Sequence, residues 1–109
     1  GSSVMGNFLE KNIPFDAVFG FTETALIGAK SVIQKRGLRI PLDVSICCVS
    51  GTTLCTLVHP TITAVEQPVE QMAIEACRLL MQNIAGSDKP VEDVVLRGEL
   101  VERESTINH

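Results

Sequence analysis

The chain has 109 residues, 45% of them hydrophobic, which is enough for one domain around one hydrophobic core and too few for several domains. Its 9 basic and 13 acidic residues give a net charge of -4, and the basic residues form no cluster that could neutralise the phosphates of nucleic acid or membrane lipid. No apolar run approaches the roughly 20 residues that span a bilayer, and the first residues lack the pattern of a signal peptide. We therefore expect a cytoplasmic protein that makes no membrane contact.

The first half of the chain predicts two strands around a helix. The run from Val44 to Val49 is almost entirely apolar, as in a strand covered on both faces. A helix precedes it, capped at its start by Thr22 or Thr24 and ended by Gly37. In such a βαβ unit the two strands are parallel. The predicted elements are a helical segment over residues 4–11, a short buried strand over 16–21, a helix over 24–36 and a buried strand over 44–49.

Polar side chains follow both predicted strands at the point where each strand ends. Thr22 and Glu23 come after the first strand, and Ser50, Thr52 and Thr53 come after the second. Because parallel strands end at the same edge of a sheet, where open α/β sheets bind ligands, we expect these residues to line one crevice. The alternative is that the hydroxyl groups satisfy their own loop backbone, as Ser and Thr often do in turns. The pattern leaves both interpretations open.

The second half of the chain predicts one long amphipathic helix between extended segments. Pro68 is placed at its first position, and its apolar face, which includes Met72, is expected to pack against the core. Leu57 and Val58 are further candidates for packing. The predicted elements are an irregular or single helical turn within residues 52–60, a short strand or extended connection over 61–67, a helix over 68–85 and an extended segment over 91–105 that is either an edge strand or a strand that crosses between layers.

The residue patterns of an enzyme or a metal centre are missing from the sequence. The four cysteines lack the spacing of zinc ligands, and three of them lie in apolar runs that predict buried thiols. No nucleophile elbow, phosphate-binding glycine loop or metalloprotease motif occurs. Glu23 could act as a base but has no evident catalytic partner. We therefore expect neither catalysis, nor a metal site, nor a bound cofactor.

Three stretches of the chain resemble the C-terminal part of LacI/GalR-type transcription regulators. They read PFDAVFGFTETALIGAKSVIQKRGLRIPLDVSICCVS, HPTITAVEQPVEQMAIEACRLLMQNIAG and VVLRGELVERES. The resemblance implies a three-layer α/β fold with a mostly parallel sheet and helices on both faces, as in the C-terminal subdomain of a type I periplasmic-binding-protein-like fold. It implies that residues 1–109 are a single subdomain, a fragment without that family's helix-turn-helix and N-terminal effector subdomain.

The chain departs from the family pattern where the family binds its effectors. Thr22 and Glu23 stand where Asn-Asp is common, and Ser50 stands where the family carries a ligand-binding Asp. A carboxylate accepts two hydrogen bonds from sugar hydroxyls, whereas Ser offers one weaker partner. Thr22, Glu23 and Ser50 are nevertheless the ligand-binding residues that the resemblance implies, for a sugar or a nucleobase-like effector. Glu66 replaces an Arg that is usual before Gln-Pro.

The resemblance also implies a homodimer, with Ile27, Ser31 and Val58 at the subunit interface. From spacing alone, Ile27 is either a solitary surface residue or the centre of a helix contact. We expect an effector-binding portion of a regulator, in which ligand closure changes the affinity for operator DNA held by a helix-turn-helix elsewhere. The alternatives are a subdomain of a periplasmic sugar-binding protein of a transport system and a small α/β enzyme, for which no acidic cluster or nucleophile is visible.

Overall fold

The structure, a computed structural model, describes residues 1–86 and 88–107. The chain folds as two units, residues 1–66 with 100–107 and residues 67–99, which are described separately. Within the described residues, no helix is both long and apolar enough to cross a membrane.

A sheet with the strand order β1-β2-β3-β4 organises the first unit. Strand β1 runs parallel to β2, with Gly20 opposite Cys48, and β2 runs parallel to β3, with Cys47 opposite Thr63. The parallel βαβ unit predicted from the sequence is therefore confirmed. The strand bounds are β1 Ala17–Gly20, β2 Ser45–Val49, β3 Thr63–Glu66 and β4 Glu99–Val101.

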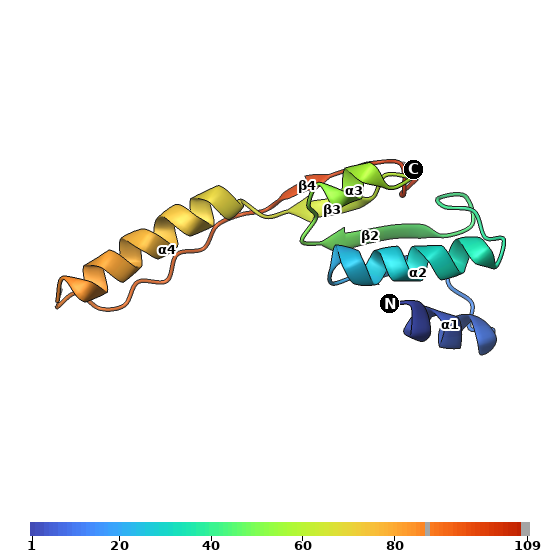
Figure 1. Ribbon diagram of the computed structural model, residues 1–109, viewed down its shortest axis with the longest axis horizontal. Helices are drawn as coiled ribbons and strands as arrows, with labels where there is room; N and C mark the ends of the chain where they lie inside the picture. Colours follow the sequence, from blue (N-terminus) through green and yellow to red (C-terminus); the bar gives the residue numbers. More distant parts are fainter. Residues whose placement is uncertain (87, 108–109) are drawn as a thin grey trace. The chain divides into compact units, whose positions relative to one another are not determined.

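Helix α2 (Glu23–Lys35) connects β1 to β2, and both of its ends follow from local sequence. At its start, the Thr22 Oγ1 accepts a hydrogen bond from the Ala25 N–H at 3.4 Å. At its end, Gly37 has a φ of +80°, a left-handed conformation that glycine adopts without steric cost. Helices α1 (Ser2–Glu10) and α3 (Leu54–Leu57) complete this unit, and α3 is the single helical turn that the sequence predicted (Figure 1).

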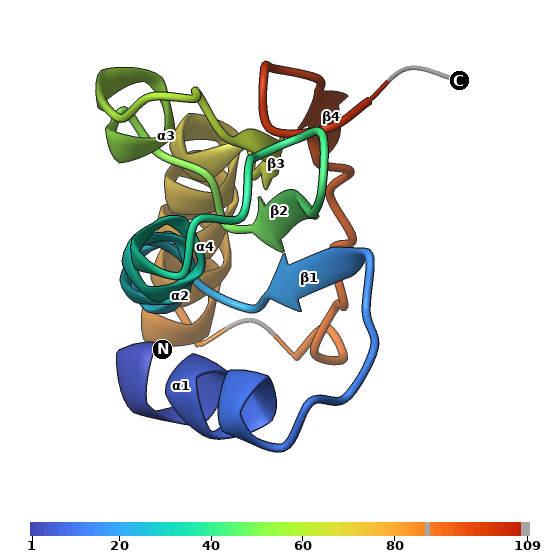
Figure 2. The same cartoon turned by 90° about the vertical axis from the view of Figure 1, so that its right-hand side faces the viewer.

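The core lies between the helices and one face of the sheet, with α1 and α2 on the same side of β1 and β2 (Figure 2). The predicted burial of the 16–21 strand is wrong in part, because β1 is an edge strand and only alternate side chains turn toward α2. Phe19 is 65% exposed and Phe21 is 78% exposed. Leu57 is also exposed, whereas Cys55 on the same turn is buried. The buried core residues are Met5, Leu26, Ala29, Ile33, Val44, Ile46, Cys48, Cys55, Ile62 and Ala64.

The segment after β4 joins β2 and β3 through the fully buried Ser105. The Thr63 N–H donates to Ser105 Oγ at 2.9 Å, and Ser105 Oγ donates to the Ile46 carbonyl at 2.6 Å. Arg103 donates to the Ile62 carbonyl at 2.8 Å and forms an ion pair with Glu66. These contacts fix residues 103–105 along the sheet.

The second unit consists of α4 (Val69–Ile84) and the extended segment that follows it (Figure 1). Pro68 is the N-cap of α4 rather than its first helical residue. The helix is amphipathic as predicted, but the prediction that its apolar face is buried is wrong for this unit, since Met72 is 46% exposed and Leu80 is 59% exposed. Within the unit, the only described partner of α4 is the extended segment, which is too narrow to cover a whole helix face.

Candidate functional site

The candidate site lies at the carboxyl ends of β1 and β2. Because Gly20 is opposite Cys48 in the parallel pair, the loop that begins at Phe21 and the loop that begins at Ser50 leave the sheet side by side. This is the edge at which open α/β sheets bind ligands. The structure thus brings the two predicted groups of polar residues to one edge.

Glu23, the first residue of α2, joins these two loops directly. Its Oε2 accepts a hydrogen bond from the Thr52 N–H at 2.8 Å, and both carboxylate oxygens lie 2.7 Å from Thr52 Oγ1. The Cys55 thiol lies 3.7 Å from Glu23 Oε2 and donates to it. The Glu23 carboxylate is therefore satisfied by the second loop. The sequence analysis assigned Glu23 and Thr52 to the same crevice but gave no sign of their pairing.

Ser50 has a backbone conformation that few non-glycine residues adopt. Its φ is +65°, in the left-handed region, and strain of this kind is concentrated at functional sites. The next residue is held tightly, because the Gly51 N–H donates to the Val65 carbonyl at 3.1 Å. A Cβ atom on Gly51 would lie 2.4 Å from the Ala64 side chain. The loop that carries Ser50 is thus pinned against β3.

Two buried thiols, of Cys48 on β2 and Cys55 on α3, lie next to each other near this loop. Cys48 Sγ and Cys55 Sγ are 4.0 Å apart, and both residues are buried. Burial is the main cause that raises the pKa of Cys48 to about 12, and burial also raises the pKa of Cys55. Both groups therefore remain neutral at physiological pH. The prediction of buried thiols is confirmed for Cys48 and Cys55, whereas Cys47 is half-buried and Cys77 is exposed, and all four cysteines are free.

Hydroxyl groups at this edge also accept hydrogen bonds from the backbone of their own loops, which is the alternative interpretation given in the sequence analysis. Thr22 Oγ1 caps α2, and Thr52 Oγ1 accepts a hydrogen bond from the Leu54 N–H at 3.3 Å. Thr22 and Thr52 are exposed and Ser50 is half-buried, so Thr22 and Ser50 are both partly accessible to solvent at the same edge. Among the described residues, no cluster of three or more His, Cys, Asp or Glu side chains could hold a metal ion.

Phe21 is the feature of this edge that the sequence analysis missed. It was placed in a buried strand, but its ring is 78% exposed and directly precedes Thr22. The signal was the position of Phe21 next to the polar residues Thr22 and Glu23, directly after β1 ends at Gly20. An exposed aromatic ring beside hydroxyl groups offers an apolar surface next to polar ones.

Three further predicted residues lie on or next to the outer surface of α2. Ile27 and Ser31 are one helical turn apart and line a shallow groove of about 470 Å³, together with Lys30, Gln34 and Lys35. The buried Lys30 donates from Nζ to the His59 carbonyl at 2.5 Å and to Gln34 Oε1 at 3.1 Å. Desolvation lowers the pKa of Lys30. Because His59 follows Val58, this contact ties the third predicted residue to the same helix.

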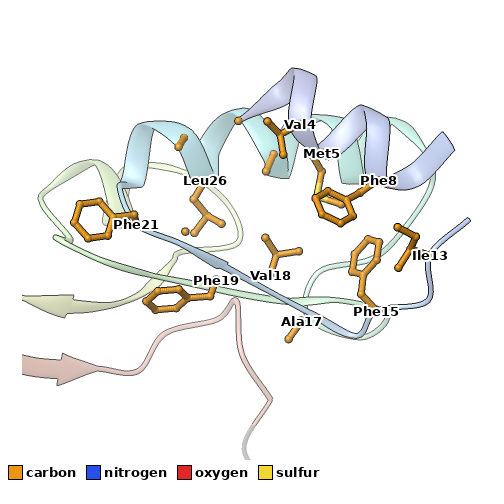
Figure 3. Close-up of a pocket in the computed structure, with 14 residues that line it drawn as sticks. Val4, Met5, Phe8, Ile13, Phe15, Ala17, Val18, Phe19, Phe21 and Leu26 are labelled. Atoms are coloured by element: carbon orange, nitrogen blue, oxygen red, sulfur yellow. The ribbon is translucent and has the colours of Figure 1, made fainter. Parts of the chain in front are cut away.

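A second cavity of about 470 Å³ runs between α1, β1 and α2, and its lining is mostly apolar. Figure 3 shows Met5 and Phe8 pointing from α1 toward Phe15 and Val18. Phe21 lines one end of this cavity, whereas Thr22, Glu23 and Ser50 do not line it. A ligand with many hydroxyl groups has few hydrogen-bond partners there, so the cavity does not alter the choice of candidate site.

Comparison with known proteins relates this chain to one domain family and to transcriptional regulators. A model of the periplasmic binding protein-like domain matches residues 5–106. The HTH-type transcriptional regulator DegA of Bacillus subtilis (strain 168) is 33% identical over 106 residues, which are 97% of this chain and 31% of that protein. The chain therefore spans about a third of the length of the curated relatives it matches.

Two solved structures with bound sugars are similar to the fold of this chain. The transcriptional regulator CelR–cellobiose complex is 33% identical with a TM-score of 0.88, covering 95% of this chain and 32% of that one. A periplasmic binding protein/LacI transcriptional regulator from Alkaliphilus metalliredigens QYMF, complexed with D-xylulofuranose, is 29% identical with a TM-score of 0.82, covering 97% of this chain and 38% of that one. The predicted resemblance and the predicted fold are both confirmed by these matches.

Proposed function

Because this chain belongs to the periplasmic binding protein-like domain family, we propose that it forms part of the effector-binding and dimerisation portion of a LacI-type transcription regulator. The observation that carries the proposal is the position of Thr22 and Ser50 at adjacent carboxyl ends of parallel strands. The relatives reported above are transcription regulators, which favours this function over a transport protein and over an enzyme.

The proposed effector is a small, uncharged sugar. Thr22 and Ser50 supply hydroxyl groups, which donate and accept hydrogen bonds but carry no charge. The exposed ring of Phe21 supplies apolar area against which one face of a sugar ring can pack. Cellobiose and D-xylulofuranose, bound in the two related structures, belong to this chemical class.

The proposed mechanism is a population shift without bond chemistry. An effector that contacts the edge of β1 and β2 together with a second subdomain favours the closed arrangement by its differential affinity for the two states. Closure changes the geometry of a homodimer, and hence the affinity of a helix-turn-helix for operator DNA. The groove on α2 that Ile27 and Ser31 line is the proposed dimer surface, with Val58 beside it. A regulator of this kind acts in the cytoplasm.

Calorimetric titration of the full-length protein encoded by the gene tests this proposal. Cellobiose and D-xylulose are the probes, and the double variant Thr22→Ala/Ser50→Ala is expected to bind at least tenfold more weakly than the wild type, because two hydrogen bonds are lost. Thr53→Ala removes a nearby exposed hydroxyl and is the matched control. Equal affinity of the double variant and the wild type would contradict the assignment, and binding of neither sugar at millimolar concentration would exclude this effector class.

A further inference from the structure

The Glu23 side chain spans the gap between two loops that are separated by 29 residues in sequence. It begins α2, while its partner Thr52 lies two residues beyond the strained Ser50. The carboxylate accepts from both the backbone N–H and the hydroxyl of Thr52, at 2.8 Å and 2.7 Å. Hydrogen bonds to a charged acceptor are roughly twice as strong as neutral ones.

The loop that carries Ser50 is held from both sides. Ser50 directly follows the end of β2, and the N–H of the next residue, Gly51, donates to the Val65 carbonyl of β3. Thr52 is then held by Glu23 of α2. The Glu23–Thr52 contact therefore adds a restraint on the α2 side of the loop, and this restraint opposes relaxation of the left-handed conformation of Ser50.

We propose that Glu23 is a positioning residue, whose carboxylate holds the β2–α3 loop so that the Ser50 hydroxyl faces the effector. The inference rests on the proposed effector site, and it assigns Glu23 a role through Thr52 in place of a direct effector contact. Three donors of the second loop, namely the Thr52 N–H, the Thr52 hydroxyl and the Cys55 thiol, point at the Glu23 carboxylate, and we assign the effector contact to the hydroxyl groups of Thr22 and Ser50.

Hydrogen–deuterium exchange of the Thr52 amide tests the contact without any effector. In the full-length protein encoded by the gene, this amide is expected to exchange slowly, because its N–H is bonded to Glu23. Glu23→Ala should accelerate its exchange at least tenfold, and the control Thr53→Val should not, since the Thr53 side chain makes no capping hydrogen bond. Fast exchange of this amide in the wild type would overturn the inference.

Effector affinity tests the positioning role, with cellobiose and D-xylulose as probes. Glu23→Asp keeps the charge but is one methylene shorter, so its carboxylate no longer reaches Thr52. This variant should bind the effector about tenfold more weakly, the order expected for the loss of one hydrogen bond to a charged group. Thr52→Val should weaken binding similarly. Glu23→Gln keeps the reach and one acceptor oxygen and should stay within about threefold of the wild type.

A double-mutant cycle separates positioning from direct contact. Because Glu23 is proposed to act through Ser50, Glu23→Asp should have little further effect on affinity in a Ser50→Ala background. A direct contact predicts the opposite: Glu23→Gln weakens binding as much as Glu23→Asp, Thr52→Val has no effect, and the effects of Ser50→Ala and Glu23→Asp add. Unfolding free energies of all variants are measured in parallel, so that a loss of folded protein is not counted as a loss of affinity.

The exchange and affinity measurements together distinguish failure of this inference from failure of the proposed function. If the wild type binds neither sugar, the proposed function and the positioning role both fail, although slow exchange at Thr52 would still locate the contact. If the wild type binds a sugar and Glu23→Asp and Thr52→Val bind it equally well, the site stands and the positioning role of Glu23 is wrong.

Discussion

At the scale of single residues, Asp43 stabilises the turn between α2 and β2. Its carboxylate accepts from the Arg39 backbone N–H at 2.7 Å and from the Arg39 guanidinium at 2.9 Å and 3.0 Å. The side-chain hydrogen bond from Arg39 is the main cause that lowers the pKa of Asp43 to about 2. Proton binding to this group therefore opposes folding at low pH.

The lowered pKa of Asp43 predicts acid sensitivity in a defined range. A carboxyl group with a folded-state pKa below its usual value of 3.8 contributes stability that is complete above that value and is lost as the pH falls toward 2. Asp43→Asn should therefore flatten the decline in Tm between about pH 4 and about pH 2, as measured by circular dichroism. Arg39→Gln, which removes the partner, should flatten it similarly. Parallel profiles for the wild type and both variants would show that the pair does not contribute.

Two side-chain contacts could not be predicted from the sequence. The sequence identified Glu66 as a departure from its family pattern, and in the structure Glu66 forms an ion pair with Arg103. The sequence also placed Glu23 and Thr52 at one edge without pairing them. The partners are 37 positions apart in the Glu66–Arg103 pair and 29 positions apart in the Glu23–Thr52 pair. Such contacts depend on strand register and on side-chain length, which local sequence patterns do not encode. The contribution of Thr22, Glu23 and Ser50 to effector binding stays a prediction.

At the scale of elements, glycines in two helical segments predict opposite effects of one substitution. Gly37 ends α2 with a φ of +80°, whereas Gly6 lies inside α1. A Cβ atom at either position would meet no heavy atom within 4 Å, so only backbone preference matters. Gly37→Ala should lower the free energy of unfolding by about 1–2 kcal/mol, the cost of a Cβ atom in the left-handed region. Gly6→Ala should raise it by about 1 kcal/mol through helix propensity.

Urea denaturation of both glycine variants measures this difference directly. Because the two substitutions add the same methyl group, each is the control for the other. A Gly37→Ala protein as stable as the wild type would mean that the turn after α2 rearranges at no cost. A Gly6→Ala protein of reduced stability would mean that the helix is packed more tightly at this point than its open surroundings indicate.

Secondary structure was largely predictable because apolar spacing reports local burial, but the partner of each apolar face was not. The sequence predicted the helix that became α2 and the strand that became β2 nearly to their bounds. It treated β1 as a buried strand, although β1 is an edge strand with Phe19 exposed. The periodicity of α4 was also correct, but a pattern cannot say whether the covering surface lies in the same unit.

At the scale of the whole molecule, this chain matches only part of the length of its relatives. The chain corresponds to 31% of DegA, and a clamp that closes on an effector needs a second surface opposite the edge of β1 and β2. Exposed apolar residues of α4, such as Leu80 and Ile84, are consistent with a unit that is stabilised by further contacts. The expected arrangement of residues 1–109 as a single subdomain stays a prediction.

The proposed homodimer gives the last prediction. Ser31 is exposed in the α2 groove, between Lys30 and Lys35, whereas Ile27 also packs against the core. In a twofold interface built on α2, residues near the axis approach their own copies, so Ser31→Arg would place two further positive charges close together. The dimer dissociation constant should rise at least tenfold in sedimentation equilibrium, while the protein remains folded. The control Ser3→Arg, on the exposed surface of α1, should leave it unchanged. A wild-type monomer, or a Ser31→Arg dimer of normal affinity, would show that α2 is not the dimer surface.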